Sequence, residues 1–402
     1  MGSTKVCTLI AAVRESGLEP VGLGVTESKG LKRGAVVNIE AAVESIKKSV
    51  AEAEDMARCE IDTVYVGIAG PHIRSFNSRG VTSIPTRTRE INSEDVRRVI
   101  ETARAITLSP DREIIHIVPQ EFTVDDQYGI GDPLGMVGTR LEVNVHIVTS
   151  STTAAQNIIT AVNRSGLLVG DTVLEPIAVG EAILTDDDKE LGSVLVDIGG
   201  GKTNVAIYHH GAVRHSVVVP LGGELFTNDI AVGLRTTIPE AERLKREQGC
   251  AISSMAQTEE VFEIAGMGSR QPRTISQTVL TDIIQPRAEE IVNLVRNEIQ
   301  GAGFEQQVGA GVVVTGGGAM LRGFIELAED ILDMPVRRGQ PVHPAGNGTR
   351  SLAPALPQLA EPEFATVAGL VLYGDRRRKT HDFHENSSTG LKKFVAKFRS
   401  FL

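Results

Sequence analysis

Two stretches in which an apolar strand runs into three consecutive glycines restrict the fold of this chain most. In residues 192–208 a strand reaches Asp197, the turn Gly199-Gly200-Gly201 follows, and a second strand begins. After the valines of residues 312–314, Gly316-Gly317-Gly318 leads into a helix. Glycine has no Cβ, so backbone N–H groups in such turns can approach an anion closely. One such turn would more often be structural, but the pair favours a phosphate-binding site.

The residues beside the glycines suit a phosphate ligand and a metal ion. Asp197 ends a strand next to the first turn, where a carboxylate can hold the water shell of a magnesium ion that bridges phosphates. Thr203 and Asn204 can add hydrogen bonds. A helix that follows the second turn would present its N-terminus, whose dipole favours a phosphate or a flat ring.

The chain repeats one order of elements in its two halves. Near its start, residues 5–13 and 20–25 are expected to form a hairpin, followed by an amphipathic helix at 39–57 and a buried strand at 62–69. Residue 192 starts the same order again. This predicts an α/β fold with two related lobes that face one another across a ligand cleft.

A stretch of different character separates the two parts of the first lobe. It contains short polar strands, a helix opened by Ser93, an Asp- and Gly-rich loop at 125–138 and a returning strand at 143–148. We therefore predict an inserted α+β domain. The predicted divisions are 1–69 for the start of the first lobe, 70–149 for the insert, 150–190 for the rest of the first lobe and 191–374 for the second lobe.

The C-terminal residues are expected to leave the body and bind lipid. Residues 375–390 are polar and predict a flexible linker, and 391–402 form an amphipathic helix when placed at 100° per residue. Its alternative is a helix docked on the protein's own surface, but the four cations without an acid suit anionic lipid. The predicted membrane residues are Leu391, Lys392, Lys393, Phe394, Val395, Lys397, Phe398, Arg399, Phe401 and Leu402.

Composition excludes several classes of protein. The 402 residues carry a net charge of −10 and include no Trp, so the body has no general electrostatic hold on nucleic acid and no nucleic-acid partner is expected. Three widely spaced cysteines indicate neither a disulfide framework nor a zinc site. With no signal-like or membrane-spanning stretch in the sequence, a cytoplasmic location is predicted.

Four motifs resemble those of the actin and heat-shock-chaperone ATPase superfamily. These are DIGGGKT at 197–203, VTGGGAMLRG at 314–323, EPIAVGEAI at 175–183 and PEFATVAGL at 362–370. Within that superfamily the chain resembles the bacterial cell-division family FtsA over nearly its whole length. The segments that select this family are 117–122, 129–138, 219–230, 241–249 and the amphipathic tail.

The resemblance implies an actin-like fold that binds ATP with magnesium. Asp197 would assist the metal, and Glu175 would position the attacking water of what is at most a weak ATPase. Glu242 and Lys245 would hold the ribose and base. Without the resemblance, their spacing would indicate a solvated i,i+3 ion pair on one helix face. The implied nucleotide-binding residues are Gly2, Ser3, Thr4, Lys5, Gly199, Gly200, Gly201, Lys202, Thr203, Gly222, Gly223, Glu242, Lys245, Gly316, Gly317, Gly318 and Met320.

The beginning of the chain departs from this family. Relatives start with an apolar strand and an acidic residue before an Ile-Gly-(Ser/Thr) turn, whereas this sequence starts at the turn, Met1-Gly2-Ser3-Thr4-Lys5. In the actin-like sheet that strand lies between two others. Its absence would leave backbone groups unpaired on both neighbours. We expect that the start codon is misassigned or that the sequence is truncated.

The family also implies a role. The chain would self-assemble, bind the C-terminal peptide of the division protein FtsZ near Arg273 and Arg287, and engage later division proteins through the inserted domain. It would sit on the cytoplasmic face of the cell membrane at the division site, held by anionic lipid. The alternatives are a PilM-type pilus scaffold and a metabolite kinase. A chaperone is excluded because only 28 residues follow Gly374.

Overall fold

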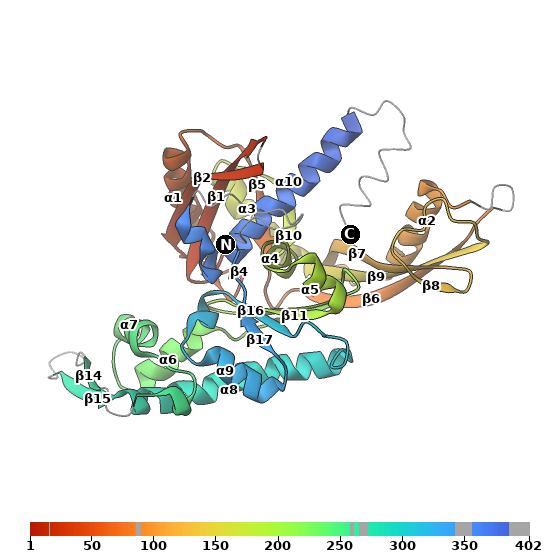
Figure 1. Cartoon of the computed structure of the whole chain (residues 1–402). Helices are drawn as coiled ribbons and strands as arrows, with labels where there is room; N and C mark the ends of the chain where they lie inside the picture. Colours follow the sequence, from red (N-terminus) through yellow and green to blue (C-terminus); the bar gives the residue numbers. More distant parts are fainter. Residues whose placement is uncertain (16, 86–89, 258–260, 265–271, 342–355, 386–402) are drawn as a thin grey trace.

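The computed structural model shows two lobes and a third domain that projects to one side (Figure 1). It describes residues 1–402 except 16, 86–89, 258–260, 265–271, 342–355 and 386–402. The predicted membrane residues, 391–402, therefore lie outside the described residues. Among those that are described, no helix is long and apolar enough to cross a bilayer.

The second lobe is built on a complete five-stranded sheet in the order β13-β12-β11-β16-β17. Central β11 pairs antiparallel with β12 and parallel with β16, and all six of its residues are buried. The strands are β11 (Ser193–Ile198), β12 (Thr203–His209), β13 (Ala212–Val219), β16 (Val312–Thr315) and β17 (Val336–Arg338). β11 is apolar on both faces because helices cover both sides of the sheet.

The two faces of this sheet belong to different cores. Val194 and Val196 pack with the helices of the second lobe, whereas Leu195 packs with α4 and α10. The elements of the second lobe beyond its sheet are α6 (Gly223–Gly233), α7 (Ile238–Gln248), η1 (Ser253–Met255), β14 (Val261–Ile264), β15 (Arg273–Ser276), α8 (Gln277–Ala302), η2 (Gly317–Met320) and α9 (Phe324–Leu332).

The sheet of the first lobe is divided into two separate pairs. β1 pairs antiparallel with β2, and β5 pairs parallel with β10, but no ladder joins β1 to β5 in the described part of the chain. The elements are β1 (Lys5–Arg14), β2 (Gly17–Glu27), β3 (Leu31–Lys32), β4 (Ala35–Val36), α1 (Ile39–Ala57), β5 (Thr63–Ile68), α3 (Thr152–Arg164), β10 (Leu168–Leu174), α4 (Glu175–Ile183), α5 (Asp186–Leu191), η3 (Pro357–Ala360), η4 (Pro362–Phe364) and α10 (Ala365–Glu385).

The inserted domain is an antiparallel sheet with one helix and its own core. Its strand order is β6-β9-β7-β8, and α2 packs on β6 and β9. The elements are β6 (Arg74–Ser83), α2 (Ser93–Arg104), β7 (Arg112–Val124), β8 (Gln127–Ile130) and β9 (Arg140–Ser151). A capping box of Asn92 and Asp95 opens α2, which explains why the helix begins at the predicted Ser93.

The structure corrects the prediction that a flexible linker begins at residue 375. Residues 375–385 continue the helix, and its side chains anchor it to the first lobe. Arg377 lies 2.7 Å from Asp171, Arg376 lies 2.9 Å from Glu181, and Asp375 is buried. The polar composition that suggested a linker thus reflects ion pairs with the lobe, which keep the helix ordered.

His146 joins the inserted domain to the second lobe. Its ring Nδ1 lies 2.7 Å from Asn77 Oδ1 on β6, and its Nε2 lies 2.9 Å from Ser216 Oγ on β13. Burial, with smaller contributions from His215 and His116, lowers the pKa of His146 to about 3. The folded protein therefore holds this ring neutral, with Nδ1–H donating to Asn77 and Nε2 accepting from Ser216.

We expect acid to weaken this junction. The unfolded chain takes up a proton on His146 below about pH 6.5, but the folded chain does not, so the stabilisation is complete above that pH and is lost as the pH falls toward 3. Between pH 6.5 and 4.5 the unfolding free energy should fall by about 2 to 3 kcal/mol more than in His146→Gln. Urea unfolding followed by circular dichroism measures this.

The matched control is His210→Gln, because His210 is exposed. That variant should keep the full pH dependence of the unchanged protein. Equal pH slopes for His146→Gln and the unchanged protein would contradict the assignment.

Candidate functional site

The predicted glycine turns meet at one cavity between the lobes. Its volume is about 140 Å³, and it is lined by residues 1–5 of the first lobe and by residues 199–202 and 316–317 of the second. Glu175 from the start of α4, Asp197 from the end of β11 and Asn204 from β12 also line it. Residues far apart in the sequence thus converge because both lobes direct their turns to the same place.

The two lobes present hairpin turns with the same hydrogen bond. Gly2 N–H donates to Lys5 O at 2.9 Å, and Gly199 N–H donates to Lys202 O at 2.9 Å. The turns approach each other so closely that a Cβ on Gly201 would lie 2.5 Å from Ser3 Oγ. Glycine at position 201 is therefore required by the facing turn of the other lobe.

A buried network of charged and polar groups lies beneath the turns. Lys202 Nζ donates to Glu175 Oε1 at 2.9 Å and to Ala69 O at 2.8 Å. Asn204 Nδ2 donates to Glu175 Oε2 at 3.1 Å and to Asp197 Oδ2 at 3.0 Å. Lys202 comes from the second lobe and both of its partners from the first, so this ammonium group ties the lobes together.

The network contains two carboxylates for one ammonium. Burial, and next the charge of Glu175, raise the pKa of Asp197 to about 6. Asp197 is therefore largely ionised at neutral pH, but its buried negative charge has a free-energy cost in the folded protein. A cation bound beside it would relieve that cost, which is the electrostatic condition for metal assistance at this position.

Unpartnered polar atoms also point to a ligand. Ser3 Oγ and Asn204 Oδ1 are both buried without a hydrogen-bond partner, although buried polar atoms are generally paired. In the described part of the chain no three His, Cys, Asp or Glu side chains gather to hold a metal by themselves. A magnesium ion would fit here only with ligand oxygens and water completing its shell.

The second glycine turn packs against the end of β11. Gly316 has a φ of +84°, and a Cβ there would lie 2.5 Å from Asp197 Oδ1. The sequence predicts a helix directly after this turn, but a short 3-10 turn, η2, intervenes and α9 begins only at Phe324. Met320 in η2 is exposed. A Cβ on Gly318 would lie 2.3 Å from Ile198 Cγ2, so that glycine serves close packing.

Glu242 and Lys245 pair on α7, as their spacing predicts, but they are not a freely solvated pair. Lys245 Nζ lies 2.6 Å from Glu242 Oε2 and also donates to Gly223 O at 3.2 Å. Burial acts to raise the pKa of Glu242, but hydrogen bonds from Lys245 and Thr227 outweigh it and lower the pKa. The pair is thereby held against the start of α6, whose Gly223 bonds to the first glycine turn.

Three further predicted residues, Thr203, Gly222 and Gly223, support the hairpin from behind and do not line the cavity. Thr203 Oγ1 donates to Leu221 O at 2.8 Å. A Cβ on Gly222 would lie 2.5 Å from Gly200 O, so glycine there lets residues 221–223 pack under the turn. Gly223 N–H donates to Gly199 O at 2.8 Å.

The short turn η4 and the start of α10 contribute cavity residues that the sequence did not single out. Glu363, Thr366 and Leu370 line the cavity, and Glu363 lies 3.2 Å from Lys5 Nζ. Within the motif at 362–370, Gly369 was the residue that could have indicated a close helix crossing. A Cβ there would lie 1.8 Å from Ala178 O. Such a close crossing of α10 and α4 brings the start of α10 to the site.

The two arginines predicted to bind a partner both contact α6 or its end. Arg287 on α8 pairs with Asp229 of α6 at 2.7 Å and also with Glu290. Arg273 at the start of β15 is exposed and donates to Leu234 O at the end of α6. Part of the hydrogen-bonding capacity of both guanidinium groups is thus already used within the lobe.

The sequence matches one family of known proteins. A family model for the cell division protein FtsA matches residues 194–369, and one for the SHS2 domain inserted in that family matches 70–149. The chain is 43% identical over 375 residues to the cell division protein FtsA of Pseudomonas aeruginosa, covering 93% of this chain and 88% of that protein. It is 34% identical to its counterpart in Escherichia coli over 382 residues, covering 93% and 89%.

Solved structures share the fold at low sequence identity. The PilM-PilN type IV pilus biogenesis complex superposes with a TM-score of 0.65 at 19% identity, covering 93% of this chain and 96% of that one. MreB5 of Spiroplasma citri bound to ADP superposes with a TM-score of 0.55 at 14% identity, covering 96% and 97%. The predicted actin-like bilobal α/β fold with an inserted domain is confirmed.

Removal of the Lys202 ammonium should destabilise the protein strongly. Lys202→Met would leave Glu175 and Asp197 buried without their cation, which costs about 3 to 5 kcal/mol of unfolding free energy. Lys29→Met breaks an exposed pair with Glu27 at 3.6 Å and should cost less than about 1 kcal/mol. Urea unfolding followed by circular dichroism compares the two.

A second substitution separates charge from packing. Glu175→Gln added to Lys202→Met removes one of the unpaired carboxylates and should recover part of the loss. If Lys202→Met costs no more than Lys29→Met, the buried network does not hold the lobes together.

Proposed function

The chain belongs to the FtsA family of cell division proteins, and from this premise we propose that it is an actin-like ATP-binding adaptor that tethers the FtsZ ring to the cell membrane. The observation that carries the nucleotide part is the convergence of two glycine turns, from opposite lobes, on one cavity with buried carboxylates. The adaptor part rests on family membership and on the amphipathic sequence at 391–402.

ATP with magnesium is the ligand whose chemistry suits the cavity. Phosphate oxygens would accept from the backbone N–H groups of the facing turns and from the unpartnered hydroxyl of Ser3. The adenosine end would extend toward residues 316–318, Glu242 and Lys245. A bound magnesium ion would neutralise phosphate charge beside Asp197.

The same network favours binding over rapid hydrolysis. Both oxygens of Glu175 already accept hydrogen bonds, one from Lys202 and one from Asn204. A carboxylate in that state is poorly placed to take a proton from water, so we infer at most a weak ATPase that needs a lobe movement to act. Nucleotide would then mainly set the relative position of the lobes and, with it, self-assembly.

Narrowing the cavity at its glycine turn should weaken nucleotide binding. In Gly201→Val the new side chain would collide with Ser3, and we expect the affinity for a fluorescent ATP analogue with magnesium to fall about tenfold or more. Gly131→Val is the matched control, because no atom lies within 4 Å of the Cβ position at Gly131. Fluorescence titration measures binding, and thermal melts show that both variants fold.

Unchanged affinity in Gly201→Val would place the nucleotide elsewhere. Transfer of phosphate from ATP to a small metabolite would instead favour the kinase alternative.

Membrane attachment would come from residues 391–402. Four cations near an anionic surface contribute about 1 kcal/mol each. Burial of the apolar arc adds to this, and its residues are Leu391, Phe394, Val395, Phe398, Phe401 and Leu402. A twelve-residue helix is too short to be stable in water, so it would fold as it binds and one tail would bind reversibly. Self-assembly would join several tails on one membrane and raise their avidity.

Partner contacts would use separate faces of the molecule. The C-terminal peptide of FtsZ would bind the second lobe at the surface beside α6, where Arg273 of β15 and Arg287 of α8 lie. Later division proteins would engage the inserted domain, which projects away from both lobes (Figure 1). This arrangement would place the chain on the cytoplasmic face of the membrane at the division site.

A vesicle experiment tests the tether. Purified chain and FtsZ are sedimented with vesicles that contain phosphatidylglycerol, with and without ATP. We expect FtsZ to pellet only when the chain is present. Phe398→Glu places a charge in the apolar arc and should lower the partition coefficient about tenfold or more. Ser400→Glu adds the same charge on the opposite side of the helix and should change it much less.

Arg273→Glu distinguishes the binding of FtsZ from the binding of the membrane. It should reduce the pelleting of FtsZ and leave the pelleting of the chain itself unchanged. Equal pelleting of Phe398→Glu and Ser400→Glu would remove the membrane role of this helix.

A further inference from the structure

The inserted domain is attached to the first lobe by its two chain connections. The chain leaves the first lobe after β5, and it returns through β9 into α3. Arg112 at the start of β7 holds the two connections together, because its Nη2 donates to His72 O and to Thr149 O, each at 3.0 Å. These bonds fix the base of the inserted domain on the first lobe.

The inserted domain also bonds to the second lobe. β6, β7 and β9 all contact β13, which lies at one end of the five-stranded sheet. Ser75 Oγ donates to Ser216 O at 2.6 Å, and Gln120 Nε2 donates to Val213 O at 2.8 Å. We call the four side chains of the inserted domain that bond to β13 the insert latch: Ser75, Asn77, Gln120 and His146.

The members of the insert latch also bond to one another. Asn77 Nδ2 donates to Arg214 O at 3.2 Å. Its Oδ1 accepts from His146 Nδ1 at 2.7 Å and from Gln120 Nε2 at 3.3 Å, and both of these donors belong to buried side chains. Buried hydrogen bonds weaken steeply when their groups are misaligned, and a buried polar group without a partner is costly. The insert latch thus stabilises one position of the inserted domain on β13.

The cavity between the lobes is narrow in this same arrangement. Its volume is about 140 Å³, whereas pockets that hold a small-molecule ligand usually have about 300 Å³ or more. The facing turns lie close together, with the Cβ position of Gly201 2.5 Å from Ser3 Oγ. If ATP binds there, as proposed above, the lobes must move apart to admit it.

Such a movement reaches the insert latch through the sheet of the second lobe. β12 begins directly after the turn at 199–202, and β13 pairs with β12 from end to end. The turn and β13 therefore move together. The inserted domain stays with the first lobe, to which its two chain connections hold it. Separation of the lobes thus displaces β13 from the side chains of the insert latch.

We propose that the insert latch holds the lobes in the arrangement with the narrow cavity, so that ATP binding and release of the inserted domain from β13 form one linked equilibrium. This inference rests on the proposed ATP-binding function. None of the four latch side chains lines the cavity, so they act as positioning residues through β13. Because linkage is reciprocal, a protein that bound the face of the inserted domain freed from β13 would raise the affinity for ATP.

Removal of one amide of the insert latch tests this linkage in the full chain. In Gln120→Met the side chain keeps its length but can no longer donate to Val213 O, so the arrangement with the narrow cavity loses a bond that the open arrangement lacks. We expect the affinity for a fluorescent ATP analogue with magnesium to rise about fivefold. A loss of packing alone would lower the affinity or leave it unchanged.

The matched control is Gln156→Met on α3. Gln156 is exposed, and its amide bonds to Thr160 of the same helix at 3.4 Å. The chemical change is the same, but it lies away from β13. This variant should keep the affinity of the unchanged protein.

Hydrogen exchange of the unchanged protein gives a second readout that needs no variant. Magnesium ATP should speed amide exchange in residues 74–79 of β6 and 212–217 of β13 about threefold or more, because the contact between these strands opens. Exchange in α2 of the inserted domain should stay unchanged.

Three results would overturn the proposal. Equal or lower affinity in Gln120→Met, with the variant folded in thermal melts, would mean that the insert latch does not oppose ATP binding. If that variant does not fold, exchange in β13 that is unaltered by magnesium ATP would decide against the linkage. Failure of the unchanged protein to bind the analogue would instead overturn the ATP-binding function itself, and the linkage with it.

Discussion

The arrangement of both lobes depends on the buried ammonium group of Lys202. The Lys202 side chain extends from the first glycine turn of the second lobe and donates hydrogen bonds to Ala69 O and Glu175 of the first lobe. Because Asp197 shares the network through Asn204, the cavity holds one more carboxylate than it has cations. An interior of this kind is stable only if the groups stay together, and it favours a ligand that brings a metal ion.

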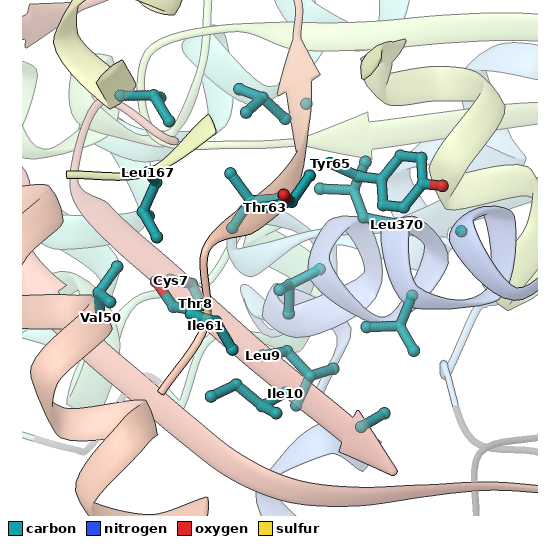
Figure 2. A pocket seen from close by; sticks show the side chains of 18 of the residues that line it. Cys7, Thr8, Leu9, Ile10, Val50, Ile61, Thr63, Tyr65, Leu167 and Leu370 are labelled. Carbon is teal, nitrogen blue, oxygen red and sulfur yellow. The ribbon is translucent and has the colours of Figure 1, made fainter. Parts of the chain in front are cut away.

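A second cavity, of about 400 Å³, lies between β1 and β5 beside the cavity between the lobes (Figure 2). Met1, Cys7 and Leu370 line both cavities. The turn at residues 2–5 leads into β1, and Thr4 O accepts a hydrogen bond from Ser28 N–H at 2.9 Å, whereas the turn at 199–202 joins two strands of a five-stranded sheet.

Much of the site could be predicted because its signals are local. Glycines after an apolar strand, Asp197 at a strand end and the i,i+3 pair of Glu242 and Lys245 are visible in a few neighbouring residues. Glu363 and Thr366 were not predicted, since their place depends on the crossing of α10 over α4. The helix through residue 385 was missed for a related reason: the ion-pair partners of Arg376 and Arg377 lie 195 and 206 positions earlier.

By itself the sequence determined the fold class, the family and the convergence of two glycine turns, because these follow from short-range patterns of apolar residues and glycine. Only the tertiary structure decided how the charges are shared: that Lys202 bonds Glu175 and that burial raises the pKa of Asp197. It also decided that β1 and β5 line opposite sides of a cavity. Such properties arise from burial and from distances between remote segments, and a linear pattern contains neither.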